Sequence, residues 1–303
     1  MTIDFVPPSL TLPRQKGVHA RLRRAMGGGD RAEQVATFAA NRAVGRIDLA
    51  VKAAGGITRR AHVFEDGPLR MRLPGAPAHA AEAVIVNTAG GIAGGDRLAI
   101  AVTAGAGASL VVTSAAAEKV YRALGPSATI GVTLNLGAGA SLAWMPQETI
   151  LFDRARLART IDVELAADAR LLVAEAVVFG RTAMGEAVEE GSFTDRWRVR
   201  RGGRLIYAES VRLEGAIAAR LAEPAIAGGC VAAATVLVVP GDDAAVAAVR
   251  ACGQDCQADV GVSAWNGVAL VRLCALDGAA LRHDLMLILS RLHGGPLPRL
   301  WMN

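Results

Sequence analysis

Hydrophobic and polar residues alternate in three runs along the middle of the chain. Alternation with a period of two indicates strands that bury one face and expose the other. The apolar members are Leu98, Ile100 and Val102, then Ile130, Val132 and Leu134, then Ile161, Val163 and Leu165. Each run is followed within a few residues by a second apolar segment, which indicates a second strand.

A small-residue turn joins the two strands of each unit. Gly-Ala-Gly-Ala-Ser-Leu occupies residues 105–110 and again 137–142, and a weaker copy, Ala-Ala-Asp-Ala-Arg-Leu, occupies 166–171. Units of about 30 residues that cannot bury their own apolar face stack on their neighbours. The repeat therefore predicts successive layers, or two packed sheets built in the manner of a β-helix, with close turns at the corners.

The C-terminal third adds further strands and two helices. Strands are expected over residues 194–199, 205–213, 231–239, 260–263 and 268–273. Helices are expected over 244–252, after Asp242 and Asp243, and over 279–292, where Asp277 is a suitable N-cap. The predicted fold class is mostly β, a β-helix-like stack of sheets with two α-helices in the C-terminal third. Residues 1–34 are expected to form a mobile basic tail, and 35–303 a single β-rich domain.

A glycine-rich run lies between two predicted strands and reads Asn-Thr-Ala-Gly-Gly-Ile-Ala-Gly-Gly-Asp over residues 87–96. It lacks the Gly-Lys-Ser/Thr ending of a phosphate-binding loop, and the order and following helix of a dinucleotide site. We interpret it as a structural loop that forms a tight turn or an interaction surface. Its defining residues are Gly90, Gly91, Gly94, Gly95 and Asp96.

Composition and charge narrow the classes of partner. Of the 303 residues 52% are hydrophobic, and no apolar run approaches the length of a membrane span. Residues 1–72 carry a net charge of +7 and the remainder −2, but only 4% of the chain is aromatic. Because the arginines are not interleaved with base-stacking rings, nucleic-acid binding is disfavoured. We expect a cytoplasmic protein that binds neither membrane nor nucleic acid.

Carboxylates gather after the repeat strands and are the main candidates for chemistry. If the layers stack, Glu148 and Glu175 share one side of the stack. Three interpretations remain open: a carboxylate pair for glycoside hydrolysis, weak oxygen ligands for a divalent ion in transit, or a solvated acidic rim. Cys252 and Cys256 lack a second pair of ligands nearby, so buried apolar cysteine is a better interpretation than structural zinc.

Several segments together resemble the urease accessory protein D (UreD) family, called H in some bacteria. The glycine-rich run is one of them. The others are Glu-Lys-Val-Tyr-Arg (118–122), Met-Pro-Gln-Glu-Thr-Ile-Leu-Phe (145–152), Gly-Arg-Thr-Ala-Met-Gly-Glu (180–186) and Leu-Pro-Arg-Leu-Trp (297–301). Gly-Pro-Leu-Arg (67–70) also fits the N-terminal part of the family.

The resemblance implies a non-enzymatic scaffold. Proteins of this family join accessory protein F and the GTPase G, bind urease apoprotein, and support GTP-dependent insertion of nickel. It also implies a mostly β fold, no stably bound cofactor, nickel only in transit, and GTP on the partner alone. Glu148 and Glu186 match family positions near the nickel path, whereas Asp153 and Glu175 are added from spacing alone. The alternative is a β-helical carbohydrate-active enzyme using a carboxylate pair, which the low aromatic content disfavours.

Overall fold

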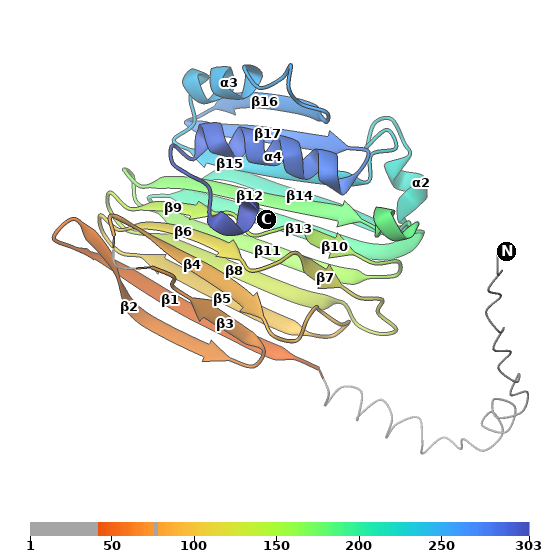
Figure 1. Ribbon diagram of the computed structural model, residues 1–303, viewed down its shortest axis with the longest axis horizontal. Coiled ribbons are helices and arrows are strands. Elements are labelled where there is room, and N and C mark those ends of the chain that lie inside the picture. Colours follow the sequence, from red (N-terminus) through yellow and green to blue (C-terminus); the bar gives the residue numbers. More distant parts are fainter. Residues whose placement is uncertain (1–41, 76–77, 303) are drawn as a thin grey trace, which may run out of the picture. The chain divides into compact units, whose positions relative to one another are not determined.

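The computed structural model describes residues 42–75 and 78–302. The predicted tail over 1–34 and its boundary with the domain lie outside these residues. Within them the chain folds into two layered β-sheets, and the two longer helices lie on the outside of one sheet (Figure 1).

The first layer is a seven-stranded sheet whose middle five strands are parallel. In spatial order its strands are β14 (Arg204–Ala216), β13 (Glu190–Arg201), β11 (Arg156–Leu165), β8 (Ala128–Leu136), β5 (Arg97–Ala104), β1 (Val44–Ala54) and β2 (Ile57–Asp66). The outermost pair at each end, β13 with β14 and β1 with β2, is antiparallel.

The second layer is a ten-stranded sheet. Its main path runs through β16 (Asp259–Trp265), β17 (Val268–Ala275), β15 (Ala232–Val239), β12 (Arg170–Phe179), β9 (Ser141–Trp144), β6 (Ser109–Ser114), β4 (Ala80–Asn87) and β3 (Leu69–Arg72). The short strands β10 (Thr149–Leu151) and β7 (Glu118–Val120) continue the parallel stack beside the far end of β12.

The predicted repeat is the stack itself. Strands β5, β8 and β11 lie side by side in one sheet, and β6, β9 and β12 lie side by side in the other. In the register of the first sheet Ile100, Val132 and Ile161 are aligned across the three strands, and all three face the interior. The predicted fold class is therefore confirmed, because each unit buries its apolar face only against its neighbours.

The turns of successive units approach closely, which explains their small residues. A Cβ atom on Gly137 would lie 2.8 Å from the backbone nitrogen of Ala106 in the preceding turn. Gly107 donates its backbone N–H to Ala138 at 2.8 Å, so neighbouring turns are also hydrogen-bonded. A larger side chain at position 137 would push the layers apart.

Both predicted helices are present, with a short third one. The two are α3 (Asp243–Arg250) and α4 (Gly278–Leu292), and the third is α2 (Ile217–Leu221). The Asp242 carboxylate accepts the Ala245 N–H at 2.9 Å, and Asp277 accepts the N–H groups of Ala279 and Ala280, so both predicted caps form. One turn is too short to show helical periodicity, which is why the sequence did not reveal α2.

Two apolar clusters stabilise these layers. The larger fills the space between the sheets, and the smaller lies between α4 and the outer face of the ten-stranded sheet. Alternate residues of β12 serve both: Leu171 and Val173 face the first cluster, whereas Leu172 and Ala174 face the second. A continuous apolar run in the sequence of β12 thus reflects burial of the strand on both faces.

Candidate functional site

The glycine-rich run lies against the segment 118–122. Ile92 donates its N–H to the Lys119 carbonyl at 2.7 Å and accepts the Tyr121 N–H at 2.8 Å. The Tyr121 hydroxyl donates to the Gly90 carbonyl at 2.7 Å. Two segments about 30 residues apart therefore form one hydrogen-bonded unit at the end of the stack.

Close packing accounts for two of the glycines. Gly91 has φ of +153° and a Cβ there would lie 2.4 Å from the Tyr121 ring. A Cβ on Gly94 would lie 2.5 Å from that of Ala123. Gly90 and Gly95 also have positive φ, and Asp96 accepts the N–H groups of Ala43 and Ala93 at 2.9 and 2.7 Å. The run is thus a tightly held connection from β4 to β5.

The segments 145–152 and 180–186 join the same network. The rings of Tyr121 and Phe152 meet edge to face with centroids 5.2 Å apart, and the Arg181 guanidinium lies 4.2 Å from the Phe152 centroid. Arg181 also forms a two-pronged ion pair with Glu186, at 2.6 and 3.0 Å. The hydrogen bond from Arg181 lowers the pKa of the Glu186 carboxyl.

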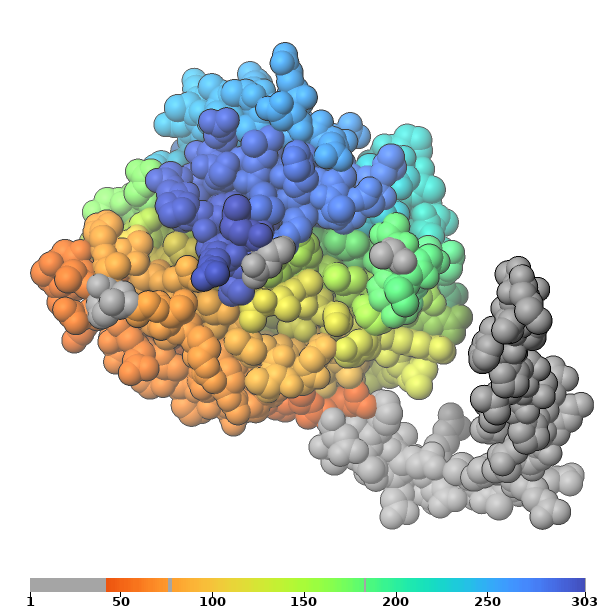
Figure 2. Space-filling view, in the orientation of Figure 1, coloured from red at the N-terminus to blue at the C-terminus, as the bar shows by residue number. Residues whose placement is uncertain are grey.

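The C-terminal segment 297–301 completes this network by packing back on the sheet. Trp301 is buried, and its indole N–H lies 3.2 Å from both Thr113 Oγ1 and the Met145 carbonyl. Arg282 on α4 donates to the Trp301 carbonyl at 3.0 Å and pairs with Glu148 at 2.8 Å. All five longer family-like segments therefore meet on one face, which we call the motif face (Figure 2).

A cleft of about 610 Å³ lies on the motif face, between the start of α4 and the short 3₁₀ helix η1 (Thr182–Met184). Ile150, Val178 and Ala279 contribute apolar surface to it. Glu148, Arg181 and Arg282 add charged groups. Met184 also lines the cleft and is 74% exposed. An open apolar cleft with charged sides is suited to protein contacts.

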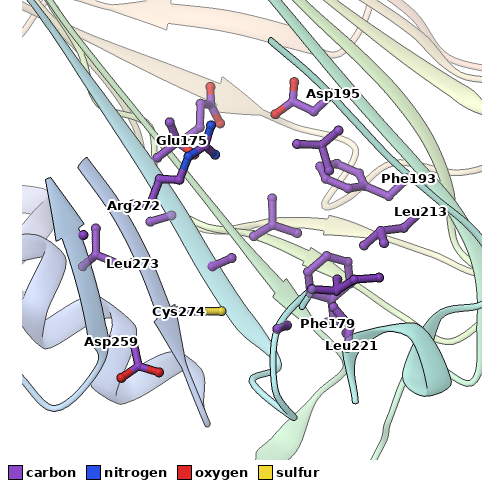
Figure 3. A pocket seen from close by; sticks show the side chains of 18 of the residues that line it. Glu175, Phe179, Phe193, Asp195, Leu213, Leu221, Asp259, Arg272, Leu273 and Cys274 are labelled. Carbon is purple, nitrogen blue, oxygen red and sulfur yellow. The ribbon is translucent and has the colours of Figure 1, made fainter. Parts of the chain in front are cut away.

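A second cavity, of about 550 Å³, lies between the two sheets near α2. In Figure 3, Glu175 and Arg272 extend from one wall, and Phe193 and Asp195 from the opposite wall. Cys274 and Asp259 belong to the part formed by β16 and β17. The cavity is largely apolar, with its charges concentrated in a few side chains.

The inner end of this cavity carries a buried ion-pair cluster. Arg159 of β11 donates to Asp195 through Nε at 3.1 Å and Nη2 at 2.5 Å, and to Glu175 through Nη1. The Trp144 indole donates to the other oxygen of Glu175 at 2.8 Å. Burial raises the pKa of Glu175, and the charge of Arg159 opposes that rise. The cluster joins the two sheets across the interior.

The predicted carboxylates therefore fall into separate places. Glu148 points outward to Arg282, whereas Glu175 points inward to Arg159, so the two lie on opposite faces of the ten-stranded sheet. The expectation that they share one side is wrong, because Glu148 is one residue out of phase with the inward positions. Asp153 lies near Glu186, and its carboxylate accepts the Glu190 N–H at 3.1 Å. A glycosidase pair of Glu148 and Glu175 is not formed.

Three residues gain importance only in the structure. Arg159 and Asp195 lie within strands, and their sequence pattern gives no sign that these two charged side chains face inward and pair. Glu118 is the first residue of the family-like segment 118–122. It aligns with Thr149 and Val177 across the stack, and Asn87 donates to both its oxygens at 3.1 Å. Burial raises the pKa of Glu118 to about 7.

The cysteines contribute no metal cage. Across residues 42–75 and 78–302 no group of three or more His, Cys, Asp or Glu side chains is arranged to hold a metal ion. Cys252 is buried in the cluster under α4, and Cys256 is partly buried beside it. Both are accounted for by apolar packing.

Comparison with known proteins identifies the family. A family model described as UreD urease accessory protein matches residues 43–302. The chain belongs to the UreD family of urease accessory proteins. A urease accessory protein UreD of Rhodopseudomonas palustris is 54% identical over 267 residues, covering 88% of this chain and 96% of that protein. UreD 3 of a Bradyrhizobium species is 55% identical over 266 residues, with the same coverage.

The family match spans all five segments of the motif face as well as the buried cluster, which lie within residues 43–302. Among the helices in the described part of the chain, none has the length and apolar character needed to cross a membrane. This member of the UreD family therefore offers two candidate sites, the cleft on the motif face and the cavity between the sheets.

Proposed function

We propose that this chain is a non-catalytic scaffold of urease maturation. It assembles with accessory proteins F and G in the cytoplasm, and the complex binds urease apoprotein. GTP hydrolysis by the partner G drives the insertion of nickel into the urease active site. The chain itself binds neither nucleic acid nor membrane and holds no resident cofactor. Nickel is its cargo, and GTP binds only to the partner.

The observation that carries this proposal is the cavity between the sheets, with Glu175 and Asp195 at its inner end, in a chain of the UreD family. A closed set of imidazole and thiolate ligands would store nickel. Two carboxylates that already share an arginine offer only weak, exchangeable oxygen ligands. Such ligands are suited to passing an ion onward, which favours transit over storage.

Glu148, Glu186 and Asp153 are the outer candidates for the same path. Glu148 and Glu186 are each paired with an arginine of the motif face, at 2.8 and 2.6 Å. The Arg181–Glu186 pair is partly exposed on both sides, and such a pair is weak and exchangeable; Glu148 is itself buried, beside a partly exposed arginine. We propose that these carboxylates contact nickel briefly outside the cavity, while the cleft beside them contacts a partner protein.

Complementation tests the inner part of the path. Glu175→Gln would be introduced into cells that lack the native chain, with Glu164→Gln as the matched control, because Glu164 lies on the outer face of β11 and pairs with Arg200 at 3.3 Å. Urease activity, nickel bound to urease, and co-purification with accessory protein F would be measured. We expect Glu175→Gln to lower activity and nickel content severalfold with co-purification intact, and Glu164→Gln to change neither.

The outer carboxylates need a separate variant. Replacing Glu148 and Glu186 together by Gln should lower urease activation while the complex with F still forms. Full activation by this variant and by Glu175→Gln, with unchanged complex formation, would rule out a nickel path through these residues. Loss of co-purification would instead assign them to the protein interface.

A further inference from the structure

Arg159 occupies a position that is apolar in the other units of the repeat. In the register of the parallel strands it aligns with Ile130 of β8, which in turn aligns with Leu98 of β5. All three side chains face the space between the sheets, and Arg159 is only 3% exposed. The third unit thus replaces an apolar interior residue by a guanidinium.

This guanidinium lies between two carboxylates from different strands. Asp195 is its direct neighbour on β13, and Glu175 reaches it from the opposite sheet. Both carboxylates are less than a tenth exposed. The cluster contains one cationic side chain and two acidic side chains, so Arg159 is the shared partner of both acids.

Stability alone is a weak reason for such a cluster. Replacing buried ion pairs by apolar residues of similar size is often neutral or stabilising, and the first two units already show that an apolar residue fits this stack. The cluster also faces a cavity, not solid packing. Its placement therefore points to a role for its charge.

No other cation of the cavity lining is free to replace Arg159. Besides Arg159, the lining contains one further cation, Arg272, within the described part of the chain. Its Nη1 pairs with Glu209 at 2.7 Å, and its side chain is 52% exposed. If Arg159 lost its charge, Glu175 and Asp195 would face the cavity as buried acids without a counter-ion.

We propose that Arg159 is a positioning residue that keeps Glu175 and Asp195 as weak ligands by remaining between them. A divalent cation entering the cavity then competes with a guanidinium and does not meet two free carboxylates. Arg159 thereby prevents the interior from storing the ion. This inference rests on the proposed function, because it assigns a regulator to the same internal path.

The test measures nickel binding directly. The full chain would be titrated with nickel chloride by calorimetry as wild type, Arg159→Met, Arg159→Lys and Arg159→Met/Glu175→Gln. Arg200→Met is the matched control, because it removes a surface arginine whose partner is the exposed Glu164. Changes in the groups that orient metal ligands typically alter metal affinity by about 10–100-fold.

We expect Arg159→Met to bind one nickel ion at least about tenfold more tightly than wild type. Arg159→Lys, which keeps the charge, should resemble wild type, and the double variant should lose the added affinity. Arg200→Met should change nothing. A folded Arg159→Met whose nickel affinity equals that of wild type would overturn the proposal, as would equal tightening in Arg200→Met.

Folding and urease activation separate the remaining outcomes. Arg159→Gln replaces Arg159→Met if the latter fails to fold; failure of both neutral variants with rescue by Arg159→Lys would overturn the proposal in favour of a purely structural charge. Tighter nickel binding without any change in urease activation would support Arg159 as regulator and reject the path through Glu175. Loss of activation in Glu175→Gln with no tighter nickel binding by Arg159→Met would support the path through Glu175 and reject Arg159 as its regulator.

Discussion

The space between the two sheets and the layer outside the ten-stranded sheet are both apolar, but they are built differently. The interior comes from repeated strands in which each residue aligns with its counterpart one unit away. The outer layer depends on distant segments, such as Trp301, whose indole contacts Thr113 and Met145. The interior therefore follows from the sequence repeat, whereas the outer layer forms only when the C-terminal segment packs back on the sheet.

Carboxylates also behave differently in the two regions. On the motif face Glu148 and Glu186 each meet a partly exposed arginine. In the interior the Glu175 carboxylate pairs with the buried Arg159, and at the end of the stack the partly buried Glu118 accepts the Asn87 amide N–H. The buried Arg159–Glu175 pair has both partners desolvated, whereas the Arg181–Glu186 pair is partly exposed on both sides, so the interior pair is the more costly place for charge.

The largest expected effect tests whether the outer layer depends on its C-terminal closure. Trp301→Ala should destabilise the fold by about 3 to 5 kcal/mol, because it empties a buried indole site and removes the ring beneath Arg282. Chemical denaturation measures this change. Met302→Ala, at a side chain that is 68% exposed, is the control and should be nearly neutral. Equal stability of both variants would contradict the dependence.

Two glycines of the run 87–96, which connects β4 to β5, should differ in why they resist substitution: one for lack of space and the other for its backbone conformation. Gly94→Val should cost about 3 kcal/mol, since a Cβ there overlaps that of Ala123. Gly90→Ala should cost only about 1 kcal/mol, because its φ of +74° is unfavourable but its Cβ would meet open space. Thermal melts of the two variants would report the order. A reversed order would disprove the packing explanation.

A pH series tests the cost of charge inside the stack. The pKa of Glu118 rises from 4.5 to about 7 on folding, so stability should fall as pH increases from 4.5 to 7. Glu118→Gln should remove this loss, stabilising the fold at pH 8 by up to about 3 kcal/mol and much less at pH 5. Denaturation at both pH values decides the matter. The same gain at both would exclude ionisation as the cause.

The smallest effect is expected on the motif face. Glu186→Gln breaks a partly exposed ion pair with Arg181, so no measurable change in the melting temperature is expected at low or high salt. A large loss of stability would show that this face shares the interior's sensitivity. Urease activation by the same variant separately tests its part in the proposed nickel path.

The strands and long helices were predictable because local patterns specify them. Period-two alternation marked β5, β8 and β11, and aspartate caps marked the starts of α3 and α4. The candidate site was predictable only in part. Its family-like segments were visible in the sequence, but their meeting on one face depends on contacts between residues up to 188 positions apart.

The sequence by itself determined the repeat, the two layers that follow from it and the family. Those properties depend on neighbours along the chain and on the need of each unit to bury one face. Only the tertiary structure decided that Glu148 faces outward and Glu175 inward, and that Arg159 occupies the interior position of Leu98 and Ile130. A shift of one residue in a strand moves a side chain to the other face, so its surroundings follow from register and packing.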